Sequence, residues 1–394
     1  MKSNIGTGTK KIFYDDAYEK YFEANVISCE ACEKGYEIIL NQTAFFPEEG
    51  GQSPDTGFLK TAEGKEVEVK DVQIKDGIIY HYTDEPIEED LVVSGEIDFA
   101  RRFSNMQNHS AEHLFSGLVC ETFGAENVGF HLSDNEVTAD YDKAISEEEL
   151  AEIERKVNRI IQKNIETSQW FPDEDELADI DFRSKKDIKG QVRLIVFPGV
   201  DICACCAPHV ANTGEIGLFK IVSVQSHRGG VRVSMLAGMR AFDYLKQVYD
   251  AMMDTSRFMT TSFTEVRQRV EALKDENFET KGKLAELQTQ SLKEELLKKS
   301  ESKKQIAFVD GLDMNIIRKC ASEIYESRGG MVAIFSKAKE AYQYIVIADG
   351  DVSIYQKELA KLGAKGGGRA PAIQGTVDAI EEDIKKWFDK IELT

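Results

Sequence analysis

The sequence has few of the features that mark secreted or membrane proteins. Its seven cysteines are an odd number, which argues against a framework of disulfides. No apolar run approaches the roughly 20 residues that a transmembrane helix needs. Residues 1–16 (MKSNIGTGTKKIFYDD) contain no apolar core of a signal peptide. We therefore expect a cytoplasmic protein with no membrane partner.

Positive charge is also scarce. The 394 residues include 49 lysines and arginines against 70 aspartates and glutamates, so the net charge is -21 at pH 7. This balance gives no general attraction to nucleic acid, and a nucleic-acid partner would need local basic patches. A hydrophobic content of 42% and a charged content of 30% are typical of a soluble globular protein with several domains.

The segments of the chain predict an α+β protein. Residues 1–95 alternate β-branched and aromatic residues between turn sequences such as KDG and PDTG, which predicts a small β-barrel-like domain. Residues 96–247 mix helices and strands, with a capping box from Ser146 to Glu149. Residues 304–394 indicate a C-terminal α/β domain that contains a glycine-rich loop, KLGAKGGGRAPAIQGT.

Between these domains, residues 248–303 contain no proline and a single glycine, Gly282. Apolar residues recur there at a spacing of three and four, which is typical of a coiled-coil-like helix; they are Phe263, Val266, Val270, Leu273, Leu284 and Leu287. A long helical linker is therefore expected. Two alternatives remain open: the helix pairs with a second copy in a homodimer, together with the C-terminal domain, or it folds back on its own chain.

Two pairs of scarce residues predict a metal site. The stretch NHSAEHLFSG (108–117) favours a helix, so His109 and His113 share one face. Cys205 and His209 are also four apart and follow the buried strand VRLIVFPGV. Together they offer three nitrogens and one sulfur, a donor set that suits tetrahedral Zn²⁺. Cys203 and Cys206 offer alternative sulfurs in the same segment.

The chemistry of such a site stays open at this point. Glu112 completes the pattern H-x-x-E-H, in which a glutamate acts as general base, but it could instead support a ligand histidine or face solvent. Four protein ligands close a zinc site, whereas hydrolytic zinc usually keeps an open position. The residues alone therefore allow a zinc peptidase or esterase, or a non-catalytic RNA-binding protein with structural zinc.

Four blocks closely resemble the editing domain of alanyl-tRNA synthetase and the free-standing trans-editing proteins called AlaX. They are TAFFPEEGGQSPDTG (43–57), RRFSNMQNHSAEH (101–113), CCAPHVANTGEIG (205–217) and GGVRVSMLAGMRAFDYL (229–245). The usual C-G-G-T-H of the family is C-C-A-P-H here. The long helix and GGGRAPAIQG resemble the C-terminal part of alanyl-tRNA synthetase, so the likeness is to a long AlaX form.

The resemblance implies a zinc-dependent trans-editing hydrolase that serves translation fidelity. Its substrate would be tRNA(Ala) mischarged with serine or glycine. The family pattern assigns the zinc to His109, His113, Cys205 and His209, and places Thr43 near the amino-acid side chain. The turn Gly50-Gly51-Gln52 would approach the substrate, with His131 facing the same pocket or serving structure alone. No aminoacylation half is recognisable, so we expect the chain to correct errors rather than to charge tRNA.

Basic residues near these blocks are candidates for tRNA contact. Arginines flank the expected zinc site, and further basic residues interleave with glycines near the C-terminus, where backbone amides and cations together can hold phosphates. We expect tRNA to contact Arg101, Arg102, Arg228, Arg232, Lys365 and Arg369. The alternative for Lys365 to Arg369 is a surface turn.

Overall fold

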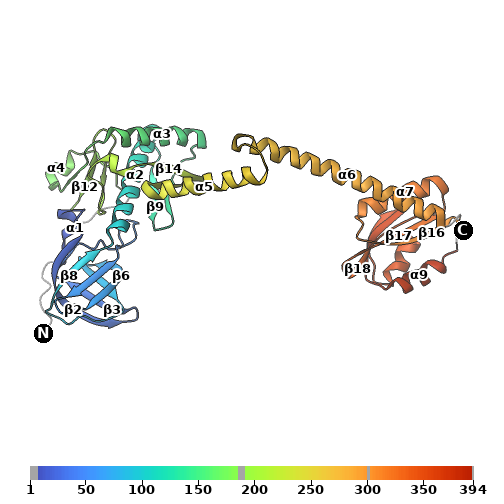
Figure 1. Cartoon of the computed structure of the whole chain (residues 1–394), viewed down its shortest axis with the longest axis horizontal. Helices are drawn as coiled ribbons and strands as arrows, with labels where there is room; N and C mark the ends of the chain where they lie inside the picture. The colour runs from blue at the N-terminus through green and yellow to red at the C-terminus, as the bar shows by residue number, and fades with distance from the viewer. Residues whose placement is uncertain (1–7, 185–190, 300–301, 393–394) are drawn as a thin grey trace. The chain divides into compact units, whose positions relative to one another are not determined.

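The computed structural model describes residues 8–184, 191–299 and 302–392. Contacts divide the chain into two compact units, residues 1–252 and 253–394 (Figure 1). Each unit has hydrophobic cores of its own. Among the described residues, no helix combines the length and the apolar character that crossing a membrane requires.

The first unit begins with a closed, six-stranded antiparallel barrel, blue in Figure 1. Its strands follow the order β2 (Tyr21–Cys32), β3 (Gly35–Leu40), β7 (Ile78–Thr83), β6 (Glu66–Lys75), β5 (Gly57–Thr61) and β8 (Val92–Ile97). Alternate side chains fill the interior, for example Ile79, His81 and Thr83 of β7. Beside the barrel, β1 (Lys10–Lys11) pairs in parallel with β4 (Gln42–Thr43), and α1 spans Ile12–Asp15. The expected barrel is confirmed.

Helix α2 (Phe99–Phe123) follows the barrel and carries the first half of the candidate site. The Asp98 side chain accepts the Arg101 N–H at its start, and Gly124 ends it in the left-handed conformation with φ 58°. Every side chain from Asn105 to Val119 is buried. A helix enclosed on all sides holds its polar residues in fixed positions, and these must find partners inside the protein.

Two sheets and several helices complete the first unit. A four-stranded sheet has the order β14 (Phe219–His227), β15 (Gly230–Ala237), β10 (Val137–Tyr141) and β9 (Asn127–Leu132). A three-stranded sheet contains β11 (Ser168–Trp170), β12 (Leu194–Phe197) and β13 (Asp201–Ala204). The helices are α3 (Glu147–Lys163), α4 (Glu174–Ala178), a 3-10 turn at Thr213–Ile216, and α5 (Gly238–Phe258). Helix α2 packs on strands of both sheets, on α3 and on the 3-10 turn. The predicted capping box of Ser146 and Glu149 is present at the start of α3.

The second unit contains a five-stranded sheet between helices. Its order is β16 (Lys304–Asp310), β17 (Met331–Ala338), β18 (Ala341–Ala348), β20 (Ala372–Val377) and β19 (Lys365–Arg369), and only β16 and β17 are parallel. One face packs on α8 (Ser353–Ala360) and α9 (Glu381–Asp389), and the other on α6 (Val266–Lys299) and α7 (Met314–Arg328). The predicted α/β character of this segment is therefore confirmed.

The predicted helix over 248–303 is real but interrupted. Helix α5 ends at Phe258, and a 3-10 turn at Phe263–Glu265 leads into the 34-residue α6. Thr260 lies in this break with a φ of 51°, in the left-handed region, and the Ser256 hydroxyl at the end of α5 donates to the Thr261 carbonyl. Leu292 and Leu296 of α6 are buried against α7. Several earlier positions of the apolar spacing remain exposed, namely Phe263, Val270, Leu273, Leu284 and Leu287.

The glycine-rich segment differs from the prediction. Residues 365–369 form the edge strand β19 rather than a loop. A Cβ on Gly366 would lie 2.2 Å from the Gln374 carbonyl oxygen, and one on Gly368 would lie 2.2 Å from that of Ala372. The glycines are thus explained by the close approach of β20 across the ladder, a constraint that a run of glycines in the sequence does not reveal.

Candidate metal centre

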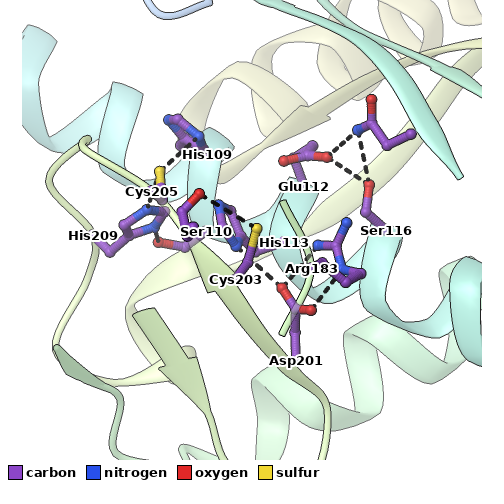
Figure 2. Close-up of polar contacts among 12 residues, drawn as sticks. His109, Ser110, Glu112, His113, Ser116, Arg183, Asp201, Cys203, Cys205 and His209 are labelled. Atoms are coloured by element: carbon purple, nitrogen blue, oxygen red, sulfur yellow. Dashed lines mark hydrogen bonds and ion pairs between the residues drawn. The ribbon is translucent and has the colours of Figure 1, made fainter. Parts of the chain in front are cut away.

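Two residue pairs with four-residue spacing meet at one point of the first unit (Figure 2). One pair projects from α2 and the other lies in the segment after β13. Together they form what we call the N3S cluster: His109, His113, Cys205 and His209. The ligand atoms of the cluster all lie within 4.8 Å of one another. The Cys205 Sγ is 3.6 Å from the His109 Nε2 and 3.4 Å from the His209 Nε2.

Each histidine of the cluster is held through its Nδ1 atom. The partners are the Gln52 Oε1 at 2.8 Å from His109, the Asp201 Oδ2 at 3.1 Å from His113, and the Ser110 Oγ at 3.0 Å from His209. An acceptor at Nδ1 places the ring proton there and leaves the Nε2 lone pair for a metal. Three oriented imidazoles and one thiol fit a tetrahedral Zn²⁺ ion.

The electrostatics favour the metal-binding protonation state at two residues of the cluster, His209 and Cys205. Burial lowers the pKa of His209 to about 3, so this imidazole is neutral near pH 7. Burial alone would raise the pKa of the Cys205 thiol, but the charge of His109 and hydrogen bonds with His109 and His113 bring that pKa well below its usual value. The thiolate is the form of cysteine that binds metal. At His113 burial alone would lower the pKa, but Cys203 and Asp201 raise it well above its usual value, so a metal ion would have to displace a proton there.

A buried arginine shapes the segment that carries Cys205 and His209. Arg193 is 6% exposed, and its Nη1 donates to the carbonyls of Cys205 (3.0 Å) and Ala207 (2.8 Å). Its Nε donates to the Gln169 side chain at 3.0 Å. The Cys205 N–H in turn donates to the Arg193 carbonyl at 3.0 Å, and beyond that point the Arg193 side chain satisfies carbonyls of an irregular backbone.

A second group of possible ligands overlaps the first. We call His113, Asp201 and Cys203 the second group; its three ligand atoms also lie within 4.8 Å of one another, and all three residues are buried. Arg183 donates to both carboxylate oxygens of Asp201, at 2.7 and 2.8 Å. Asp201, Arg183 and Ser110 belong to this site although the sequence pattern did not predict them. One signal was available for Asp201: in a strand, positions 201, 203 and 205 share a face.

Glu112 lies on α2 between the two histidines and is fully buried. Its Oε1 accepts hydrogen bonds from the Ser116 hydroxyl at 2.5 Å and from the Asn127 amide at 2.6 Å (Figure 2). Neither group of possible metal ligands includes it. The structure therefore places Glu112 beside the cluster and engages it with its own neighbours.

The Gly50-Gly51-Gln52 turn contacts the cluster directly. Gly50 and Gly51 have φ values of 64° and 83°, and a Cβ on Gly51 would lie 2.5 Å from the Phe130 carbonyl oxygen. The Gln52 side chain is fully buried; its Oε1 holds His109, and its Nε2 has no hydrogen-bond partner among the described residues. His131 is exposed on β9, next to Leu132, whose N–H donates to the Gly51 carbonyl.

Thr43 is fully buried beside the barrel interior. Its hydroxyl lies 2.9 Å from the Nε2 of His81 and accepts the Phe45 N–H at 3.1 Å. Burial lowers the pKa of His81 to about 4, and its Nδ1 faces the Ile38 carbonyl, so the neutral ring donates from Nδ1 and accepts the Thr43 proton at Nε2. The predicted contact with a serine hydroxyl would need the remaining lone pair of Thr43 and an opening toward it.

The predicted tRNA-contacting residues fall into different environments. Arg102 is a correction: its side chain is 0% exposed, pairs with Asp55 and donates to the carbonyls of Ala17 and Ala44, so no phosphate can reach it. Arg101 pairs with Asp134, and Arg232 binds Asp140 through two hydrogen bonds. The side chains of three residues are exposed: Arg228, and Lys365 and Arg369 of the second unit.

Two segments of the first unit match known protein families. Residues 192–233, which include Cys205 and His209, match the family model described as "Threonyl and Alanyl tRNA synthetase second additional domain". Residues 8–101 match the model "tRNA synthetases class II (A)". Among solved structures, a crystal structure of the C-Ala domain from Aquifex aeolicus alanyl-tRNA synthetase is 18% identical and covers 21% of this chain and 87% of that one. Its TM-score of 0.19 is too low to carry an argument.

Relatives of known name extend the likeness along the chain. The alanine–tRNA ligase of Natronomonas pharaonis is 31% identical over 371 residues, which cover 88% of this chain and 39% of that enzyme. That of Pyrococcus abyssi is 30% identical over 414 residues and covers 98% of this chain and 43% of the enzyme. The chain spans about two fifths of the length of these relatives. It is therefore an alanyl-tRNA synthetase-like protein, related to those enzymes over nearly all of its own length.

Proposed function

We propose that this chain hydrolyses the ester bond of tRNA(Ala) mischarged with serine or glycine, at a zinc ion held by the N3S cluster. The observation that carries the proposal is the cluster itself: two sequence-distant pairs supply three oriented nitrogens and one sulfur within 4.8 Å. It lies partly inside the segment that matches the synthetase family model. The relatives are alanine–tRNA ligases, which supports alanine tRNA as the RNA partner.

The reaction adds water across the ester. The water oxygen forms a bond to the carbonyl carbon, the bond to the ribose oxygen breaks, and that oxygen leaves with a proton, giving free amino acid and tRNA. Zinc, when bound, supplies a Lewis acid to this chemistry. The three Nδ1 partners fix the ligand geometry before substrate arrives, so no reorganisation is needed during the reaction.

Gln52 is the residue of the turn best placed to touch the substrate. Its Oε1 is committed to His109, while its buried Nε2 has no partner among the described residues. A buried amide donor without a partner costs free energy unless a ligand atom accepts from it. We therefore assign the Gln52 Nε2 as a donor to an oxygen of the ester. Gly50 and Gly51 allow the close approach of this turn.

Glu112 remains our proposed general base. Its contacts with Ser116 and Asn127 hold the carboxylate in place, and hydrogen bonds to a carboxylate lower its basicity. Full deacylation by Glu112→Gln would remove Glu112 from that role and leave it as support for α2.

The remaining assignments extend the proposal to specificity and binding. Thr43 would sense the serine hydroxyl, because a site built around a substrate hydroxyl discriminates strongly against the analogue that lacks it. His131 would lie near the bound substrate. The tRNA backbone would meet Arg101, Arg228, Arg232, Lys365 and Arg369, with binding that weakens as salt increases. A homodimer through the exposed apolar positions of α6 is part of the same proposal.

A second candidate function is a non-catalytic module with structural zinc. It is favoured by one observation: four protein ligands already fill a tetrahedral shell, and three of the four are buried. A zinc peptidase is less well supported, because its H-x-x-E-H motif accounts for neither the Cys205–His209 pair nor the Gly50-Gly51-Gln52 turn at the cluster.

The test is deacylation of seryl-, glycyl- and alanyl-tRNA(Ala) by metal-replete protein. We expect loss of serine and glycine with alanine retained. Retention of all three amino acids by protein that holds one zinc ion per chain would contradict the editing proposal and favour the structural module. Cleavage of simple esters or peptides without tRNA would favour a general hydrolase instead.

A further inference from the structure

Two groups of possible metal ligands share one histidine. His113 belongs to the N3S cluster and also to the second group, with Asp201 and Cys203. The second group offers a nitrogen, a carboxylate and a sulfur, which is also a plausible donor set for Zn²⁺. If the ligands of both groups were available, a metal ion could bind at the second group, or could take ligands from both groups, instead of binding at the N3S cluster.

Arg183 binds the carboxylate of the second group. Its Nε and Nη2 donate to the two oxygens of Asp201, at 2.7 and 2.8 Å, and the Asp201 Oδ2 also faces the His113 Nδ1 (Figure 2). The Asp201 side chain is only 2% exposed. A bidentate guanidinium neutralises the carboxylate and covers both of its oxygens, so a metal ion would have to displace it.

The arginine is fixed before any metal binds. The Arg183 N–H donates to the Ile202 carbonyl at 2.8 Å, and the Ala204 N–H donates to the Arg183 carbonyl at 2.9 Å. Residue 183 is therefore bound to the backbone of β13 beside Cys203. Burial alone would lower the pKa of the Arg183 guanidinium, but its bonds to Asp201 raise it, so the pair stays charged.

We propose that Arg183 occupies the cation position of the second group and thereby restricts metal binding to the N3S cluster, while Asp201 acts as a positioning residue for His113. The inference rests on the proposed metal at that cluster. It assigns opposite effects to two neighbours: loss of Arg183 adds ligands, whereas loss of the Asp201 charge weakens an existing ligand.

The experiment measures metal content and the absorption of the Co²⁺-loaded full chain, where each thiolate ligand adds a charge-transfer band. Wild type is expected to hold one ion with one thiolate. In Arg183→Gln, Asp201 and Cys203 become available, and the thiolate band should roughly double because Cys203 joins Cys205. The double variant Arg183→Gln/Asp201→Asn should return to the wild-type spectrum. Lys220→Gln, which breaks a similarly two-pronged ion pair with Glu154 away from the cluster, is the matched control.

Asp201→Asn tests the positioning role separately. It should keep one ion and one thiolate band but bind metal about 10- to 100-fold more weakly, the usual effect of losing an outer partner of a ligand histidine. Unchanged metal affinity in this variant would overturn the positioning role. Loss of a ligand signature would show that Asp201 itself binds the ion, and would overturn the inference.

The outcomes separate this inference from the proposed function. A wild-type spectrum and stoichiometry in folded Arg183→Gln would overturn the restriction by Arg183. If circular dichroism shows that this variant is unfolded, Arg183→Lys decides: lysine lacks the planar fork of the guanidinium and holds the carboxylate less tightly, so a smaller increase of the thiolate band is expected. If wild type binds no ion, the metal in the proposed function fails; an ion in Arg183→Gln would then still support the inference, and none would overturn it.

Discussion

The two halves of the N3S cluster have the same four-residue spacing and are built in opposite ways. His109 and His113 are set by α2, a helix with a cap at each end. Cys205 and His209 lie in an irregular segment whose shape comes from distant partners: Arg193 binds its carbonyls, and Ser110 binds His209 and the Val210 N–H. Local sequence determines the first half and tertiary contacts determine the second, so the second half should be the more fragile.

The largest effect on zinc binding is expected from removing the sulfur of the second half. Cys205→Ala removes the only thiol of the N3S cluster and should bind zinc far more weakly than wild type, because the site loses its one anionic ligand and keeps three neutral imidazoles. Cys206→Ala is the matched control and should keep one ion per chain, since Cys206 belongs to neither ligand group among the described residues. If Cys205→Ala binds zinc tightly and Cys206→Ala does not, the ligand is the Cys206 sulfur and our assignment of Cys205 is wrong.

His81, buried in the barrel away from the N3S cluster, should make the stability of the protein depend on pH without any metal. Burial lowers the pKa of His81 to about 4, below the value near 6.5 of an unfolded chain. Between these values the unfolded state binds the proton and the folded state does not, so stability is present above pH 6.5 and is lost as the pH falls toward 4. The loss should reach roughly 3 kcal/mol.

The His81 prediction is checked by urea unfolding between pH 6.5 and pH 4, with a chelator present so that metal binding does not contribute. The stability of His81→Gln, referred to its own value at pH 7, should fall less than that of wild type between pH 6.5 and 4. Parallel profiles for the two proteins would contradict the assignment of a neutral, buried His81.

Among its contacts, the second half of the N3S cluster, Cys205 and His209, should depend most on Arg193 for its backbone conformation. Arg193→Met leaves the carbonyls of Cys205 and Ala207 buried without these donors, which should cost roughly 2–4 kcal/mol of unfolding free energy and weaken zinc binding. Chemical denaturation and zinc competition measure the two effects. Arg155→Met, at an exposed pair with Glu152, should change stability by less than about 0.5 kcal/mol. Equal effects of the two substitutions would remove Arg193 from this role.

Ser110 connects the two halves and should show a smaller effect. Ser110→Ala removes the Nδ1 partner of His209 and an acceptor of the Val210 N–H, so zinc affinity should fall about 10-fold with one ion still bound at saturation. Competition with a chromogenic chelator gives the affinity. No change would show that the fold alone orients His209.

The helical half should tolerate loss of its cap. Asp98→Ala removes the side chain that accepts the Arg101 N–H and should cost about 1 kcal/mol of stability. Zinc affinity should not change, because His109 lies well inside α2 and is held by Gln52. A fall in zinc affinity as large as that of Ser110→Ala would break the distinction between the two halves.

The same distinction explains what the sequence could predict. The barrel, the capped helices and the two ligand pairs follow from alternation, capping residues and fixed spacing, which are local properties. The carboxylate on His113, the burial of Arg102 and the strand formed by Lys365–Arg369 depend on partners far away in the sequence. Arg101 and Arg102 are adjacent and chemically identical, yet one pairs at the surface and the other joins four segments in the interior.

The most direct test of the account compares serine release from seryl-tRNA(Ala) by wild type and by Cys205→Ala, at equal concentrations of folded protein. The account predicts rapid release by zinc-loaded wild type and release no faster than the spontaneous rate by the variant. Release by Cys205→Ala at the wild-type rate would contradict the claim that the metal centre is the site of the reaction.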